Sequence, residues 1–86
     1  MVTQATRRYD LRGLKCPLPA LKTGRRLAGL KPGDVLEVET TDPLAIIDIP
    51  HLCQQQGHVL LASEETATGH RFTIERGAVL TSEAEG

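Results

Sequence analysis

The fold is decided around residues 10–19, which run Asp10-Leu11-Arg12-Gly13-Leu14-Lys15-Cys16-Pro17-Leu18-Pro19. Just before and within this stretch, residues 7–11 alternate between polar and apolar side chains, as a half-buried strand does. After it, apolar and small side chains recur at the spacing of one helical face, at Ala20, Leu21, Gly24, Leu27 and Ala28. The sequence therefore predicts a strand, a loop that contains Gly13, and a helix over residues 17–28.

A second strand and a second helix are predicted in the middle of the chain. Residues 36–40 alternate apolar or β-branched side chains with two glutamates, which predicts a strand with one solvent-facing side. Asp42 followed by Pro43 is typical of a helix start, with the aspartate as N-cap, and predicts a helix over residues 43–56. We expect Pro50 to kink this helix or to divide it into two pieces, because proline removes a backbone donor and clashes with the preceding turn. Its apolar stripe is Ile46, Ile49, Leu52 and Cys53.

The chain is predicted to close with a hairpin of residues 59–64 and 71–76, joined by a turn at Thr68 and Gly69. The order is then βαβαββ, and right-handed crossovers place both helices on one side of the sheet. The predicted class is α/β (α+β): a two-layer sandwich with two helices packed on one face of a four-stranded mixed sheet. A chain of 86 residues has room for one core. We assign residues 1–80 to a single domain and residues 81–86 to a flexible acidic tail.

Composition and charge narrow the class of protein. Hydrophobic residues make up 40% of the chain and charged residues 24%, which is a globular balance. No apolar run approaches the roughly 18 residues that span a bilayer, and the first residues lack the apolar stretch of a secretory signal. We therefore expect a cytoplasmic protein without a membrane partner.

Charge is distributed unevenly along the chain. The first 31 residues hold eight lysines and arginines but a single acid, whereas the remainder holds two arginines and ten acids. This polarity predicts a basic surface that docks an acidic partner or steers an anion. The alternative is two solvent-exposed faces of opposite sign.

Cys16 is the candidate reactive residue. If Pro17 is the first helical residue, Cys16 is the N-cap, and its sulfur lies beside unpaired backbone N–H groups at the positive end of the helix dipole. Together with the nearby basic side chains, this position predicts a thiol pKa well below the reference value of about 8.5. The expected supporting residues lie in the loop or on the exposed side of the first helix: Gly13, Lys15, Pro17, Pro19, Arg25 and Arg26. In the alternative, Cys16 is a small buried residue that fills a gap beneath the loop.

The second thiol is interpreted differently. Cys53 lies on the apolar stripe of the second helix, so we expect it in the core. A zinc site of Cys53 with His51 and His58 is the weaker alternative, because the three show no paired-ligand spacing. We therefore expect no metal. Asp10 and Asp48 are interpreted as turn or surface acids, with orientation of the loops near Cys16 as the alternative.

The chain resembles a known family from Gly13 to Pro19. This segment is similar to the Gly-x-x-Cys-Pro-x-Pro signature that TusA/SirA sulfur-carrier proteins have at their first helix. The likeness continues through residues 31–34, 41–43, 48–53 and 57–58, and it covers about residues 8 to 77. The resemblance implies that Cys16 accepts persulfide sulfur from a cysteine desulfurase or a rhodanese-like donor and passes it to a downstream acceptor protein. Such relays serve tRNA thiolation, molybdenum-cofactor assembly or sulfur oxidation.

Two classes of function follow. A persulfide carrier needs one reactive thiol and no bound cofactor, and it acts stoichiometrically rather than as an enzyme on its own; no histidine lies near Cys16 in the sequence to serve as its base. The alternative is a redox-sensitive regulatory module, or an RNA-binding module that uses the basic N-terminal half. Direct nucleic-acid binding is disfavoured, because Tyr9 and Phe72 are the only aromatic residues. Exposure of Cys16 would favour the carrier, and its burial would favour the module.

Overall fold

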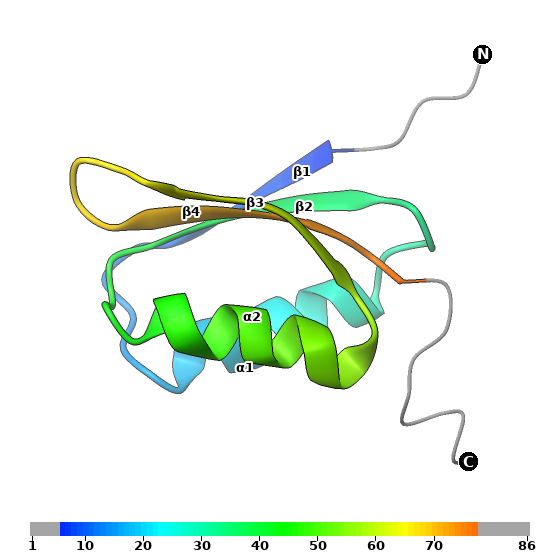
Figure 1. The fold of residues 1–86 in the computed structure, drawn as a ribbon, viewed down its shortest axis with the longest axis horizontal. Coiled ribbons are helices and arrows are strands. Elements are labelled where there is room, and N and C mark those ends of the chain that lie inside the picture. The colour runs from blue at the N-terminus through cyan, green and yellow to red at the C-terminus, as the bar shows by residue number, and fades with distance from the viewer. Residues whose placement is uncertain (1–5, 78–86) are drawn as a thin grey trace.

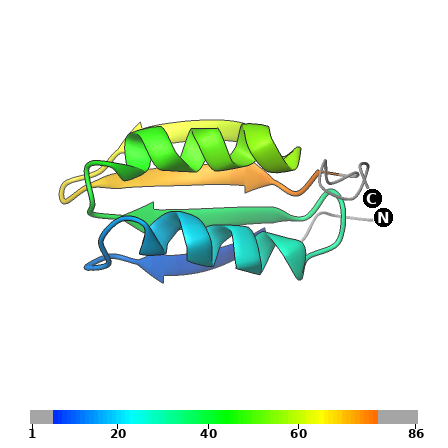
Figure 2. The same ribbon diagram turned by 90° about the horizontal axis from the view of Figure 1, so that it is seen from below.

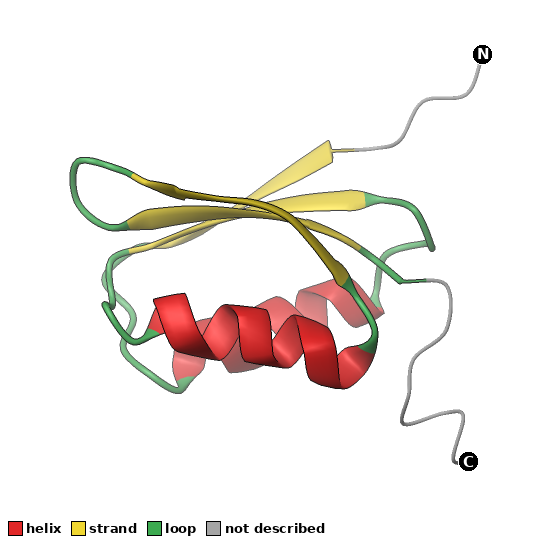
Figure 3. Ribbon diagram, viewed as in Figure 1, coloured by secondary structure: helices red, strands yellow, loops and turns green. Residues whose placement is uncertain are grey.

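A computed structural model describes residues 6–77, in which strands and helices follow the order βαβαββ (Figures 1 and 3). This order confirms the prediction. The elements are β1 (Thr6–Leu11), α1 (Leu18–Ala28), β2 (Val35–Thr40), α2 (Ala45–Gln56), β3 (Val59–Glu65) and β4 (His70–Glu75). The acidic tail predicted for residues 81–86 lies outside the described residues. No helix within residues 6–77 is long and apolar enough to cross a membrane.

The sheet is mixed, with the strand order β1-β2-β4-β3. β1 and β2 are parallel, whereas β4 is antiparallel to both β2 and β3. Figure 2 shows both helices side by side on one face of the sheet. The predicted two-layer sandwich is thus confirmed. Because β1 and β2 are parallel, their C-terminal ends lie at the same edge of the sheet, where Leu11 pairs with Thr40.

The core fills the space between the sheet and the helices. Its largest fully buried members come from four elements: Leu27 of α1, Leu36 of β2, Ile49 of α2, and Phe72 and Ile74 of β4. Cys53 is 2% exposed and belongs to this cluster, which confirms its predicted place in the core. Three members of the predicted apolar stripes are exposed instead: Leu21 at 59%, Ile46 at 44%, and Ala28. The buried faces of both helices are therefore narrower than the sequence pattern indicates.

Both helices start later than predicted. α1 begins at Leu18 with Pro17 at the N-cap, so Cys16 lies one residue before the cap and the prediction that it is the N-cap is wrong. The Leu18 N–H donates to the Lys15 carbonyl at 2.9 Å, and this tight turn precedes the helix. α2 begins at Ala45, because a turn at Pro43 and Leu44 precedes it. Asp42 still caps this turn by accepting the Leu44 N–H at 3.0 Å.

α2 runs as one helix through Pro50, so the expected division into two pieces does not occur. Proline costs the helix a hydrogen bond. Ala45, Ile49 and Cys53 keep a continuous buried face on both sides of Pro50, and their packing holds the helix together. The helix ends at Gly57, which has a φ of 79° and therefore adopts the left-handed conformation that glycine permits.

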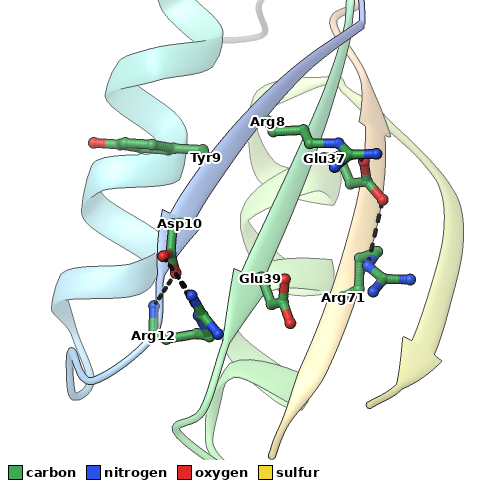
Figure 4. Close-up of a pocket in the computed structure, with 7 residues that line it drawn as sticks. All are labelled: Arg8, Tyr9, Asp10, Arg12, Glu37, Glu39 and Arg71. Carbon is green, nitrogen blue, oxygen red and sulfur yellow. Dashed lines mark hydrogen bonds and ion pairs between the residues drawn. The ribbon is translucent and has the colours of Figure 1, made fainter. Parts of the chain in front are cut away.

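The face of the sheet opposite the helices is open and charged. A hollow of about 260 Å³ lies on this face. Figure 4 shows Arg8 and Arg71 close to Glu37 among the residues that line it. The two arginines lie 3.2 and 3.3 Å from the Glu37 carboxylate. Nearby, hydrogen bonds from Arg12 lower the pKa of Asp10 to about 2. Exposed pairs of this kind contribute little to stability, so the fold depends on its single apolar core.

Candidate functional site

Cys16 lies in the loop between β1 and α1, and its side chain is exposed. The structure therefore contradicts the alternative in which this cysteine is buried beneath the loop. The loop leaves the sheet at the C-terminal end of β1, next to the segment that leads from β2 into α2. The cysteine thus stands where the first turns of both helices meet the edge of the sheet.

The β2–α2 segment holds the Cys16 loop through two contacts. Gly13 has a φ of 88°, and its N–H donates to Thr41 Oγ1 at 2.8 Å. The Cys16 N–H donates to the carboxylate of Asp42. Asp42 also accepts the Leu44 N–H, so one carboxylate fixes both the cysteine and the start of α2. The hydrogen bonds from these two N–H groups, together with the charge of Lys15, lower the pKa of Asp42.

The sulfur itself contacts a second carboxylate. Cys16 Sγ donates to Asp48 Oδ2 at 2.9 Å, and Asp48 lies in the first turn of α2. This hydrogen bond is the main cause of a raised Cys16 pKa; partial desolvation and the negative charges of Asp48 and Asp42 act in the same direction. The predicted lowering of the thiol pKa is therefore wrong. The sulfur lies before the N-cap and contacts a carboxylate, which disfavours the thiolate.

A groove of about 690 Å³ runs between α1 and α2 on the side away from the sheet. Cys16 and Asp48 lie at one end of it. Gly24 allows the helices to approach, because a Cβ at this position would lie 3.2 Å from Leu52 Cδ1. The groove is lined mainly by Pro17, Ala20, Leu21, Arg25, Leu52 and Gln56. Cys16 also borders a second hollow, of about 490 Å³, which it shares with Lys15, Asp42 and Leu44.

The expected supporting residues are placed in three ways. Gly13 and Pro17 shape the loop and the cap, and Pro19 is buried in the first turn of α1. Lys15 and Arg25 each line a hollow that contains Cys16. Arg26 lies elsewhere: its guanidinium stacks 4.3 Å from the centroid of the Tyr9 ring. The structure thus brings Arg25, but not Arg26, to the groove.

The interpretation of Asp10 as a surface acid is confirmed, because it is exposed and pairs with Arg12 on the open face of the sheet. The same interpretation of Asp48 is wrong, because Asp48 reaches the sulfur, in line with the alternative that it orients the loop near Cys16. Within residues 6–77, no three histidine, cysteine or acidic side chains gather in a way that could hold a metal ion. Of the residues weighed for zinc, His51 is exposed beside the groove, whereas Cys53 and His58 are buried. No signal in the sequence reveals that Asp48 faces Cys16, because the contact depends on how α2 packs beside the loop.

Comparison with known proteins identifies the family. The sequence profile described as "Sulfurtransferase TusA" matches residues 7–76. The chain belongs to this TusA family. It is 50% identical over 56 residues to candidate sulfur carrier proteins of Neisseria meningitidis, NMA0882 and NMB0681, which covers 65% of this chain and 76% of each relative. It is 35% identical over 80 residues to the candidate sulfur carrier protein YrkF of Bacillus subtilis, which covers 93% of this chain and 43% of that protein. These matches confirm the resemblance to sulfur carriers.

Proposed function

We propose that the protein carries sulfur as a persulfide on Cys16, which it receives from a cysteine desulfurase or a rhodanese-like donor and passes to an acceptor protein. The observation that supports this role best is the contrast between its two thiols. Cys16 is exposed at the end of a groove, whereas Cys53 is 2% exposed in the core. An exposed thiol on a loop that is held from both sides suits a carrier, which must present one sulfur atom to two different proteins.

The transfer needs no electron donor and no bound cofactor. Cys16 attacks the outer sulfur of the donor's persulfide, a new S–S bond forms at Cys16, and the S–S bond in the donor breaks. The donor cysteine leaves with the electron pair and takes up a proton. The acceptor then repeats this exchange on the outer sulfur of loaded Cys16. Each step conserves the oxidation level, so one reactive cysteine per carrier is sufficient.

The groove between α1 and α2 is the surface on which we place the donor. Leu21 supplies exposed apolar area, and Arg25 supplies a positive charge beside it. An acidic partner with an apolar contact fits this combination, and electrostatic attraction would accelerate its association. The acceptor would belong to a route such as tRNA thiolation, molybdenum-cofactor assembly or sulfur oxidation.

The test measures sulfur on the intact protein. Incubation with a cysteine desulfurase and cysteine should add one sulfur atom to the mass of the unaltered chain. Cys16→Ser should abolish the gain, and Cys53→Ala should retain it. We choose alanine at position 53 because a buried serine hydroxyl would lack a partner. Sulfur that remains in Cys16→Ser but disappears in Cys53→Ala would overturn the assignment.

A further inference from the structure

Two carboxylates that follow β2 in the chain, those of Asp42 and Asp48, accept hydrogen bonds from different atoms of Cys16. Asp42 accepts the backbone N–H, whereas Asp48 accepts the thiol proton at an Sγ to Oδ2 distance of 2.9 Å. Asp48 is half-buried in the first turn of α2. A thiolate at this distance from a carboxylate would be repelled, and the contact therefore exists only while the sulfur carries its proton.

Other charged groups near the sulfur do not remove this effect. The positive charge of Lys15 acts on Asp42, whose pKa it helps to lower. Arg25 lines the groove, but on α1 it lies about two helical turns beyond Leu18, or roughly 10 Å along the axis. His51 lies one turn beyond Asp48 on α2, and it also lines the groove. Among the charged side chains of the described residues, Asp48 is the one that is hydrogen-bonded to the sulfur.

We propose that Asp48 controls the proton on Cys16: it keeps the unloaded carrier as an aimed thiol, accepts the proton when sulfur arrives, and favours release of the sulfur once Cys16 is loaded. This inference rests on the proposed function, since it assigns a role to a second residue in the same transfer. It differs from a purely structural role, because it links the charge of Asp48 to the chemical state of the sulfur.

Loading moves one sulfur atom from the donor to Cys16 and one proton from Cys16 to the donor. Cys16 Sγ forms a bond to the outer sulfur of the donor persulfide while its proton moves onto Asp48 Oδ2. The S–S bond of the donor breaks, and the donor cysteine leaves as a thiolate. That thiolate takes the proton from Asp48, directly or through water. The products are loaded Cys16, a donor thiol and an ionised Asp48.

In the loaded form the hydrogen bond cannot be made in the same way. Sγ now carries a second sulfur in place of its proton, and a persulfide ionises more readily than a thiol. Its negative charge lies beside the Asp48 carboxylate, which disfavours the loaded state. When an acceptor removes the outer sulfur, Cys16 regains a proton and the bond to Asp48 forms again. Asp48 thus interacts favourably with the thiol form of Cys16 but not with the persulfide form. This difference shifts the equilibrium between the two forms toward sulfur release.

The first test follows the reaction of Cys16 with iodoacetamide as a function of pH, in a Cys53→Ala background that leaves one thiol. Asp48→Asn keeps the size of the side chain but removes its charge, so the midpoint of the reaction profile should move to lower pH. A shift of one pH unit increases the thiolate population about tenfold below the midpoint, and the lower nucleophilicity reduces the gain in rate to roughly threefold. Asp34→Asn is the matched control, because Asp34 lies before β2 at the opposite end of the sheet.

The second test measures release of sulfur without any partner protein. The chain is loaded on Cys16 with polysulfide and exchanged with an excess of glutathione, which takes the outer sulfur as glutathione persulfide while Cys16 takes up the proton. At equilibrium, intact mass should show that Asp48→Asn retains a larger share of its sulfur than the unaltered chain and the Asp34→Asn control. Asp48→Ala serves as a second variant, and circular dichroism confirms that each variant is folded.

The outcomes separate the two proposals. If unaltered Cys16 gains sulfur from a desulfurase but Asp48→Asn and Asp48→Ala match it in both the pH profile and the share of sulfur retained at equilibrium, the role of Asp48 is overturned while the carrier function stands. If the variants shift the pH profile but the unaltered chain never gains sulfur from a donor, the carrier function fails although the proton contact is real. A midpoint that moves to higher pH in Asp48→Asn would also overturn the inference.

Discussion

The backbone N–H of Cys16 donates a hydrogen bond to the carboxylate of Asp42, which lies 26 residues further along the chain. This contact exists because β1 and β2 are parallel neighbours whose last residues, Leu11 and Thr40, are paired. The loops that follow the two strands therefore leave the sheet side by side. The position of the Cys16 sulfur is thus set by the register of the sheet, and changes that disturb the end of β2 should reach Cys16.

Gly69 offers one way to test this dependence. A Cβ at Gly69 would lie 1.9 Å from the Thr40 carbonyl oxygen and 2.7 Å from Thr41 Cα, so backbone must move in Gly69→Ala. We expect the free energy of unfolding to fall by about 1–3 kcal/mol, as measured by urea denaturation. Alkylation of Cys16 should change as well, because Thr41 holds its loop.

Gly29→Ala is the matched control for this prediction. A Cβ at Gly29 would meet the Arg26 carbonyl oxygen at 3.6 Å, which is an ordinary contact, and its φ of −88° suits alanine. This variant should be about as stable as the unaltered chain. If Gly69→Ala and Gly29→Ala have the same free energy of unfolding, the backbone at Gly69 can shift to fit a Cβ without destabilising the fold.

The sequence predicted the fold well because local patterns specify it. Alternation at residues 36–40 and the turn residues at 68–69 reflect short-range preferences, and the observed strands end within one or two residues of the predicted ones. The helices start one and two residues later than predicted, since the loops before them hold each other through contacts that are distant in sequence: Gly13 with Thr41 and Cys16 with Asp42. A shift of the first helix by one residue is enough to move Cys16 off the N-cap.

The chemistry of the site could be predicted only in part. The exposed cysteine in the loop follows from the motif, but the sign of its pKa shift does not. Asp48 is 32 residues from Cys16, and their contact requires the packing of α2 beside the loop. The stacking of Arg26 on Tyr9 likewise depends on how closely α1 packs against β1. Neither relationship leaves a periodic signal in the sequence.

The two thiols should differ sharply in reactivity. Burial raises the pKa of Cys53 to about 11, so about one molecule in a thousand carries this thiolate at pH 8. With dithionitrobenzoate at this pH, we expect one thiol per native chain to react promptly and two in urea. Native Cys16→Ser should show almost no prompt reaction. Two promptly reacting thiols in the native unaltered chain would contradict the buried position of Cys53.

Charge reversal should separate the roles of two adjacent arginines. Arg25 lines the groove that has Cys16 at one end, so Arg25→Glu should slow sulfur transfer from an acidic donor, mainly through the association rate. Added salt should slow the unaltered protein in the same direction and affect Arg25→Glu less, because salt screens the attraction. Stopped-flow transfer rates at low and high salt measure both effects.

Arg26→Glu is the comparison for that experiment. It removes the stacking on Tyr9, which contributes about 0.5–1 kcal/mol at an exposed site, so we expect a small loss of stability and a smaller effect on transfer. Lys22→Glu changes a third exposed charge of α1 that lies outside the groove. If all three variants transfer sulfur at the rate of the unaltered protein in low salt, docking uses another surface.

His58 should make stability depend on pH. Its side chain is 7% exposed, and Nδ1 accepts the Gly77 N–H at 3.0 Å, which requires that Nδ1 carry no proton. Burial, with a smaller contribution from Arg76, lowers the pKa of His58 in the folded state. Above the unfolded value of about 6.5, both states are neutral and this residue adds no slope. Below that value the unfolded chain binds the proton first, so the free energy of unfolding falls as the pH falls.

Urea denaturation between pH 7.5 and about 5 measures this slope, in a range where Asp10 and Asp42 remain ionised because their pKa values are lowered. His58→Asn should lose much of the slope, since its Oδ1 can accept the Gly77 N–H but the side chain gains no proton. His51→Asn makes the same change at an exposed position and should keep the slope of the unaltered chain. The prediction fails if the free energy of unfolding falls with pH equally steeply in the unaltered chain and in His58→Asn. His58 would then bind its proton equally well in the folded and unfolded states, and another group would cause the pH dependence.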